Sequence, residues 1–138
     1  MARQKFYLDT SIFIDYYENR SDNIRPLGDW AFRLLMTIRN RGNVLLVSDA
    51  VFEELVQHYS KEKIDNMLQP FQDNIVEIKA TMEQREEATK TAHERNLPRR
   101  DVLHAILTRD HSAVLIARDK HFELLTDITI SRKPEELI

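Results

Sequence analysis

Four acidic side chains, far apart in the chain, are the residues that point most clearly to chemistry. Two directly follow short apolar runs, one opens a helical stretch after a proline, and one lies in an amphipathic stretch: Asp9, Asp119, Asp101 and Glu54. Carboxylates crowded together repel one another, so some of them must hold a proton. A hard divalent cation removes this conflict, because Mg²⁺ binds carboxylate oxygens and keeps water and phosphate as its other ligands. The predicted chemistry is metal-assisted hydrolysis of a phosphate ester.

Each of these acids also has a simpler interpretation. The chain contains 23 Asp and Glu residues, and most of them are expected to be solvated. Asp9 precedes a helical stretch and could cap it. In the helix expected over 49–59, Glu53 and Glu54 flank the apolar stripe at similar angles, so periodicity does not choose between them.

The elements that must position the acids alternate between short apolar runs and longer amphipathic stretches. Strands are expected at 6–8, 44–47, 75–78 and 113–117, with an edge strand at 128–130. Helices are expected at 11–18, 29–40, 49–59, 61–71, 82–95, 98–110 and 120–125, and the polar segment 19–26 is expected to be a loop. This alternation predicts right-handed crossovers and a parallel sheet with helices on both faces. Ligands of such sheets collect at the carboxyl ends of the strands, where Asp9 and Asp119 are expected.

Composition narrows the class of protein. The 138 residues, 42% hydrophobic and 31% charged, predict a single domain over 1–138. The absence of cysteine excludes disulfides and cysteine-ligated zinc, and two glycines are too few for a glycine-rich phosphate loop. Charged residues near the N-terminus interrupt the apolar stretch that a signal peptide needs, and no apolar run is long enough to cross a membrane. We therefore expect a cytoplasmic protein without membrane association. The net charge of −3 gives no electrostatic argument for nucleic acid, although acids gathered at a metal account for part of it.

Four segments together resemble the PIN domain, a family of metal-dependent nucleases that includes the VapC-type toxins of toxin–antitoxin pairs. The segments are Leu8–Ser11, Val47–Leu55, Asp101–Ala105 and Leu115–Phe122. In the second segment, Ser48 precedes a Glu-Leu pair by six positions, and this register selects Glu54 over Glu53.

The resemblance implies a three-layer α/β/α sandwich with a central, mostly parallel sheet of four or five strands. It implies that the four acids hold Mg²⁺ or Mn²⁺ and that the protein is an endoribonuclease hydrolysing RNA. It also implies an antitoxin protein and a second copy of the chain, in a homodimer, as partners.

Three departures from the family pattern leave an alternative open. His121 stands where members often carry a further acid, Ala117 stands where they often have Thr or Ser, and the loop 19–26 is longer than in the smallest toxins. The missing acid would weaken a second metal site. The alternative is a catalytically weak PIN-fold module that binds RNA or protein.

Two other phosphate-handling classes on a similar sheet are disfavoured. Haloacid-dehalogenase-type phosphatases need an Asp two residues after the first acid, where this chain has Ser11. Receiver domains need a phosphoacceptor Asp after the third strand, and the segment 79–81 offers none.

Cations next to the acids are candidate substrate contacts. Arg100, Arg118 and Lys120 adjoin Asp101 or Asp119 and could bind phosphates, although exposed arginines also form simple salt bridges. Ser11 could bond a phosphate or cap a helix. His104 shares a helix face with Asp101, where packing or a hydrogen bond to a neighbour is expected rather than a role in the site.

Overall fold

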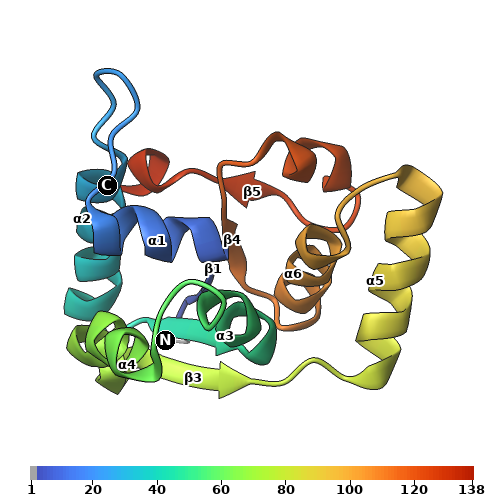
Figure 1. Ribbon diagram of the computed structural model, residues 1–138, viewed down its shortest axis with the longest axis horizontal. Coiled ribbons are helices and arrows are strands. Elements are labelled where there is room, and N and C mark those ends of the chain that lie inside the picture. Colours follow the sequence, from blue (N-terminus) through green and yellow to red (C-terminus); the bar gives the residue numbers. More distant parts are fainter. Residues whose placement is uncertain (1–2) are drawn as a thin grey trace.

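The computed structural model describes residues 3–138, so residues 1 and 2 of the predicted domain lie outside it. Five strands form one sheet in the order β3-β2-β1-β4-β5, and every neighbouring pair is parallel (Figure 1). The strands are β1 (Lys5–Leu8), β2 (Val44–Ser48), β3 (Ile75–Ile78), β4 (Val114–Ile116) and β5 (Ser131–Arg132). The predicted parallel sheet of four or five strands is confirmed.

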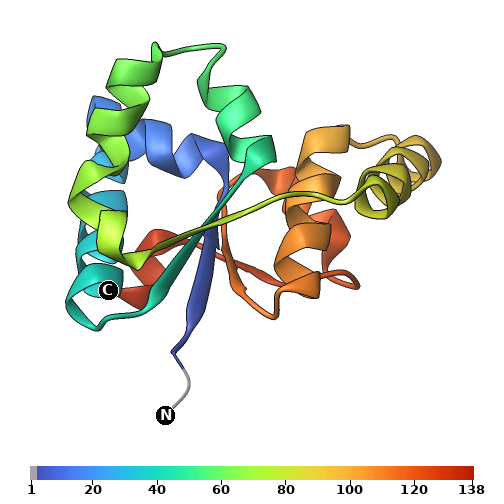
Figure 2. The same ribbon diagram turned by 90° about the horizontal axis from the view of Figure 1, so that it is seen from below.

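Helices cover both faces of this sheet. The α-helices are α1 (Thr10–Glu18), α2 (Leu27–Asn40), α3 (Asp49–Leu55), α4 (Lys61–Leu68), α5 (Met82–Arg95) and α6 (Arg99–Asp110). Three short 3-10 helices are η1 (Gln69–Asn74), η2 (Lys120–Leu125) and η3 (Pro134–Leu137). Figure 2 shows α1, α2 and α4 on one side of the strands and α6, with α5 outside it, on the other. The predicted three-layer α/β/α sandwich is confirmed.

The central strands are buried on both faces, which explains why their sequences are continuous apolar runs rather than alternating ones. In β1, Tyr7 and Leu8 are fully buried, and in β2 and β4 the same holds for Leu45, Val47 and Leu115. Within residues 3–138, no helix is long and apolar enough to cross a membrane.

Three elements differ from the prediction by three residues or more at one of their ends. The last strand is β5 rather than 128–130, because the backbone N–H groups of Ile128 and Thr129 donate to Leu125 O and form a turn after η2. Helix α3 ends at Leu55 rather than at 59. The helix expected over 61–71 ends at 68 and continues as η1, where Pro70 lacks the N–H of a helical hydrogen bond.

The loop 19–26 joins two closely packed helices. Asn19 ends α1 in the left-handed conformation. A Cβ on Gly28 would lie 2.5 Å from the Cα of Asn19, so the start of α2 can approach the end of α1 only with glycine at this position. A backbone bridge between Asp22 and Arg25 closes the loop, which projects from the body (Figure 1).

The direction of the chain reverses at the centre of the sheet. From β1 the chain moves outward to β2 and β3, then returns through α5 and α6 to β4 on the other side of β1. The carboxyl ends of β1 and β4 therefore flank the crevice in which open parallel sheets bind ligands.

Candidate metal centre at the carboxyl edge of the sheet

A small cleft of about 170 Å³ lies at this edge, and its lining includes all four acids. The lining residues are Asp9, Thr10, Ser11, Ile14, Glu54, His58, Arg100, Asp101 and Asp119. They come from the end of β1, from α1, from α3 and the turn after it, from the first turn of α6, and from the segment after β4. A larger hollow of about 860 Å³ lies at the opposite edge, but its described lining contributes one acid, Asp73.

Asp9 is held rigidly at the end of β1. Its backbone N–H donates to Ile116 O at 2.9 Å, which extends the pairing of β1 with β4 by one residue. Its side chain makes no capping hydrogen bond to α1, so the capping interpretation of this acid is not realised. Instead, Ser11 Oγ donates to Asp9 Oδ2 at 2.9 Å.

Glu54 is oriented by a buried chain of polar groups. His104, which is fully buried in α6, donates from Nε2 to Glu54 Oε1 at 2.6 Å. The other ring nitrogen of His104 contacts Tyr7 Oη at 2.6 Å, and Tyr7 Oη contacts Ser48 Oγ at 2.7 Å. Ser48 in turn caps α3 by accepting from Val51 N. Ser48 thus caps the helix that carries Glu54 and is also the last member of the hydrogen-bonded chain Glu54–His104–Tyr7–Ser48, which orients the Glu54 carboxylate.

The neighbouring Glu53 faces away from the cleft. It is exposed and lies 3.0 Å from Arg85 of α5, which also contacts Asp49 at 3.0 Å. Glu54 is therefore the residue of the pair that the fold brings into the cleft, as the second sequence segment indicated.

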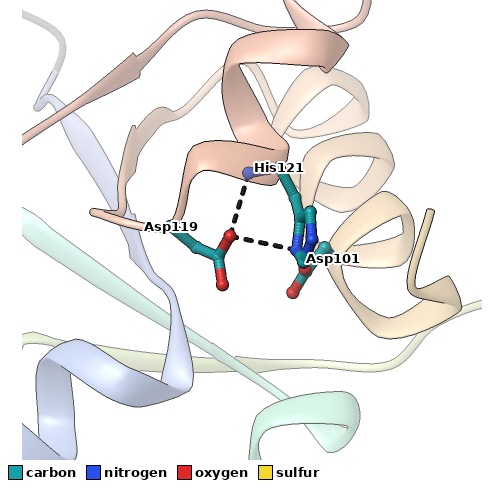
Figure 3. Close-up of side chains that lie close together, drawn as sticks. All are labelled: Asp101, Asp119 and His121. Atoms are coloured by element: carbon teal, nitrogen blue, oxygen red, sulfur yellow. Dashed lines mark hydrogen bonds and ion pairs between the residues drawn. The ribbon is translucent and has the colours of Figure 1, made fainter.

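Asp101 and Asp119 both contact the ring of His121 (Figure 3). The Nδ1 atom of His121 lies 2.9 Å from Asp101 Oδ2 and 3.0 Å from Asp119 Oδ1. Asp119 caps η2 by accepting the backbone N–H of His121 at 2.9 Å. Asp101 is buried, whereas the Asp119 side chain is 46% exposed and opens the cleft to solvent.

Burial makes negative charge costly at this site. Burial raises the pKa of Asp9, although His104 and the hydrogen bond from Ser11 oppose the shift. Burial likewise raises the pKa of Asp101, against the hydrogen bond with His121. For Glu54, burial is the largest single influence and acts in the same direction, but the hydrogen bond and the charge of His104, with smaller contributions from Thr10 and Arg100, together lower the pKa. Two of the buried carboxylates therefore need a further positive charge before they ionise readily.

Among the described residues, Asp101, Asp119 and His121 place ligand atoms within 4.8 Å of one another, close enough to hold one cation, whereas Asp9 and Glu54 line the same cleft without belonging to that group. The four acids offer carboxylate oxygens, the donors that Mg²⁺ and Mn²⁺ prefer. The buried hydroxyl of Thr10 lines the same cleft and contributes to lowering the pKa of Glu54.

Two of the four predicted substrate contacts line the cleft, and the other two do not. Ser11 and Arg100 line the cleft, and the charge of Arg100 helps to lower the pKa of Glu54. Lys120 is exposed but outside the lining. Arg118 does not line the cleft, because its guanidinium forms two hydrogen bonds with Glu135, at 2.6 and 2.9 Å.

The sequence analysis described one histidine of this site correctly and undervalued another. His104 packs in the core and makes a hydrogen bond to a neighbour, as expected, and that neighbour is the cleft acid Glu54. His121 was interpreted as the loss of an acid, whereas its ring bridges Asp101 and Asp119. Position alone did not reveal this, because the ring must meet Asp101, which lies 20 residues earlier.

Comparisons with known proteins place this architecture in a family. Residues 6–127 match the sequence model of the PIN domain, and no curated protein matches the chain. The fold is similar to that of a chain in VapBC2 from Rickettsia felis bound to a DNA fragment from their promoter, with a TM-score of 0.68 and 17% identity over 94% of this chain and 98% of that one.

Two further solved structures share the fold. PAE2754 from Pyrobaculum aerophilum has a TM-score of 0.60 and 14% identity, over 97% of this chain and 92% of that one. FitAcB from Neisseria gonorrhoeae has a TM-score of 0.60 and 17% identity, over 96% and 99%. Identities this low show a common fold only. Because the sequence match spans most of the chain and the sheet order and helix layers agree with it, the chain belongs to the PIN domain family.

Proposed function

We propose that this protein is a metal-dependent endoribonuclease in which the four acids hold Mg²⁺ or Mn²⁺. The observation that carries the proposal is the convergence of four carboxylates from distant segments in one cleft at the carboxyl edge of the sheet. Membership of a family of metal-dependent nucleases supports it. Burial that raises the pKa of Asp9 and Asp101 supports it as well, because such a site gains from a cation.

A bound divalent ion supplies a water molecule of lowered pKa and stabilises charge on the phosphate oxygens. The residues of this chain supply the positions. Asp9 and Asp101 are buried and fixed by Ser11 and His121, respectively. His104 keeps Glu54 ionised and pointing into the cleft, since its hydrogen bond lowers the pKa of that carboxyl.

The substrate must approach from the solvent side. Arg100 is exposed at the cleft and can pair with a phosphate of the backbone. The protein as a whole carries a net charge of −3, so affinity for RNA depends on local cations and on the bound metal rather than on a general attraction.

Cleavage of single-stranded RNA by the purified protein with Mn²⁺ or Mg²⁺ tests the proposal. Asp9→Asn and Asp101→Asn should each lower the rate by at least about 100-fold, since even residues behind metal ligands cost 10–100-fold. Asp65→Asn, at an exposed position of α4, is the matched control and should cleave as the wild type does. Cleavage that survives both cleft substitutions would refute the assignment of the site.

The replacement of a common family acid by His121 favours a second candidate function, that of a PIN-fold module which binds RNA or protein with little turnover. His121 replaces an acid and so removes one negative charge from the site. Calorimetric titration distinguishes the two candidates. Binding of Mn²⁺ that is lost in Asp9→Asn supports the nuclease, and the absence of divalent-ion binding supports the module.

A narrower proposal is that the protein is the toxin of a toxin–antitoxin pair. The similarity in fold to a chain of VapBC2 supports it, because VapC-type toxins belong to this family. Induced expression should then arrest growth, and co-expression of a small neighbouring gene should relieve the arrest. Asp101→Asn should remove toxicity. A homodimer, which we also propose, would appear as twice the chain mass of 16.4 kDa in light scattering.

A further inference from the structure

An imidazole nitrogen lies where a carboxylate is often found in the family. His121 Nδ1 is 2.9 Å from Asp101 Oδ2 and 3.0 Å from Asp119 Oδ1. One ligand atom from each of these three residues falls within 4.8 Å of the others. Figure 3 shows these three side chains next to one another. The ring of His121 comes from η2, the carboxylate of Asp101 from α6, and the carboxylate of Asp119 from the segment after β4.

The spacing of these atoms suits a shared ion. Adjacent ligands of an octahedral cation with bonds of about 2.1 Å lie about 3.0 Å apart. The two distances from Nδ1 have this length. They are also hydrogen-bond distances, so a cation could take the place of the bridging hydrogen with little movement of the side chains.

The backbone holds the ring in this position. The N–H of His121 donates to Asp119 Oδ1, which fixes the turn between the two residues. Asp101 is buried in the first turn of α6, so its carboxylate has little freedom. The buried hydroxyl of Thr10 also lines the cleft that Asp101 and Asp119 share.

We propose that His121 is a metal ligand, and that its nitrogen shifts the preference of the site from Mg²⁺ toward Mn²⁺ and Co²⁺. The inference rests on the proposed function, because it concerns the ion of the same cleft. Mg²⁺ prefers oxygen ligands and depends on their negative charge. Imidazole is a softer donor that suits transition metals better, and it lacks the charge of the acid it replaces. Both effects act against Mg²⁺.

Calorimetric titration of Mg²⁺, Mn²⁺ and Co²⁺ into the wild type and into His121→Asp tests the preference. The substitution restores a carboxylate at this position, so affinity for Mg²⁺ should rise. The ratio of Mn²⁺ to Mg²⁺ affinity should fall by at least about tenfold, a typical size for changes in the metal environment. An unchanged ratio would overturn the proposal.

A spectroscopic measurement tests the ligand directly. Spin-echo electron paramagnetic resonance of bound Mn²⁺ should show ¹⁴N modulation from an imidazole in the wild type. The modulation should disappear in both His121→Asp and His121→Ala. His58→Gln is the matched control, because His58 also lines the cleft, and it should keep the signal.

The outcomes separate this inference from the proposed function. Mn²⁺ that binds without ¹⁴N modulation, or with modulation that survives the His121 substitutions, overturns the ligand assignment and leaves the nuclease proposal intact. A wild-type protein that binds none of the three ions overturns both. The His121 side chain is 43% exposed, so its substitution should not prevent folding, and circular dichroism checks this.

Discussion

Arg118 and Asp119 are neighbours in the sequence, but their side chains belong to two acidic clusters with different charge balance. Arg118 forms two hydrogen bonds with Glu135 and lies 3.9 Å from Asp15, and we call these three residues the Arg118 cluster. Its guanidinium also lies 5.5 Å from the centre of the Trp30 ring. Asp119 instead joins the cleft with the other three acids.

The two clusters differ in where their countercharge comes from. In the Arg118 cluster, the guanidinium holds the pKa of Glu135 below its usual range although burial opposes this, whereas burial still raises the pKa of Asp15 against the charge of Arg118. In the cleft, the pKa of Asp9 and of Asp101 is raised by burial, because local partners compensate them only in part. The first cluster thus contains its own cation. For the second cluster, we propose that a bound divalent cation supplies the missing positive charge.

Two glutamates give the largest expected contrast between the clusters. Glu54 and Glu135 are both partly buried and both paired with a basic side chain. Glu54→Gln should lower RNA cleavage by at least about 100-fold, because it removes a proposed metal ligand. Glu135→Gln should lower the melting temperature but keep cleavage below that temperature. Equal losses of cleavage in the two variants would break the comparison.

One buried aspartate from each cluster allows the two clusters to be compared by the effect of metal on thermal stability. Asp9 and Asp15 are each 6% exposed. Mn²⁺ at about 100 times its Kd should raise the melting temperature of the wild type by roughly 10 °C, because a ligand at that excess stabilises by about 2.7 kcal/mol. The shift should vanish in Asp9→Asn and persist in Asp15→Asn. Differential scanning fluorimetry measures both, and a shift retained in Asp9→Asn would contradict the site.

The metal-free protein gives a pH-dependent version of the same contrast. Because burial raises the folded-state pKa of Asp9 above the usual 3.8, the ionised carboxylate destabilises the fold at neutral pH. Asp9→Asn should therefore melt above the wild type in EDTA at pH 7. As pH falls through the raised pKa toward 3.8, the wild-type carboxyl becomes neutral and the difference should shrink. A difference that is constant with pH would exclude this cause.

The Arg118 cluster should respond in stability. Arg118→Met leaves Glu135 and Asp15 without their cation in a mostly buried setting, so it should cost on the order of 3 kcal/mol. Chemical denaturation measures the loss. The loss in Glu135→Gln should be smaller, because the guanidinium keeps Asp15 nearby. An Arg118→Met variant as stable as the wild type would show that this cluster does not depend on its built-in cation.

The smallest expected effect concerns the RNA backbone. Arg100→Ala should weaken RNA binding modestly and lower the slope of log affinity against log salt by about 0.7, the value for one phosphate contact on a single strand. Lys120→Ala, outside the cleft lining, should change the slope less. Fluorescence anisotropy with a catalytically inactive Asp101→Asn background measures both. A larger change for Lys120 would move the path of the RNA away from Arg100.

Most of the fold could be predicted from the sequence, because burial on both faces leaves a local signature. The apolar runs at 44–47 and 75–78 mark their strands, and the helix 82–95 was predicted with its observed bounds. The edge strand was predicted at the wrong position, because Ser131 and Arg132 pair with β4 through their backbone and no apolar pattern signals such a pairing. The apolar residues at 128 and 130 lie instead in the segment that joins η2 to β5.

The sequence by itself determined where each of the four acids stands relative to its own strand or helix. Only the tertiary structure decided which side chains meet. In the folded protein, Glu53 contacts Arg85 and Glu54 contacts His104. Arg118 binds Glu135 and does not line the cleft. The physical reason is that periodicity fixes the face a residue occupies on one element, whereas contacts between elements depend on how all layers pack.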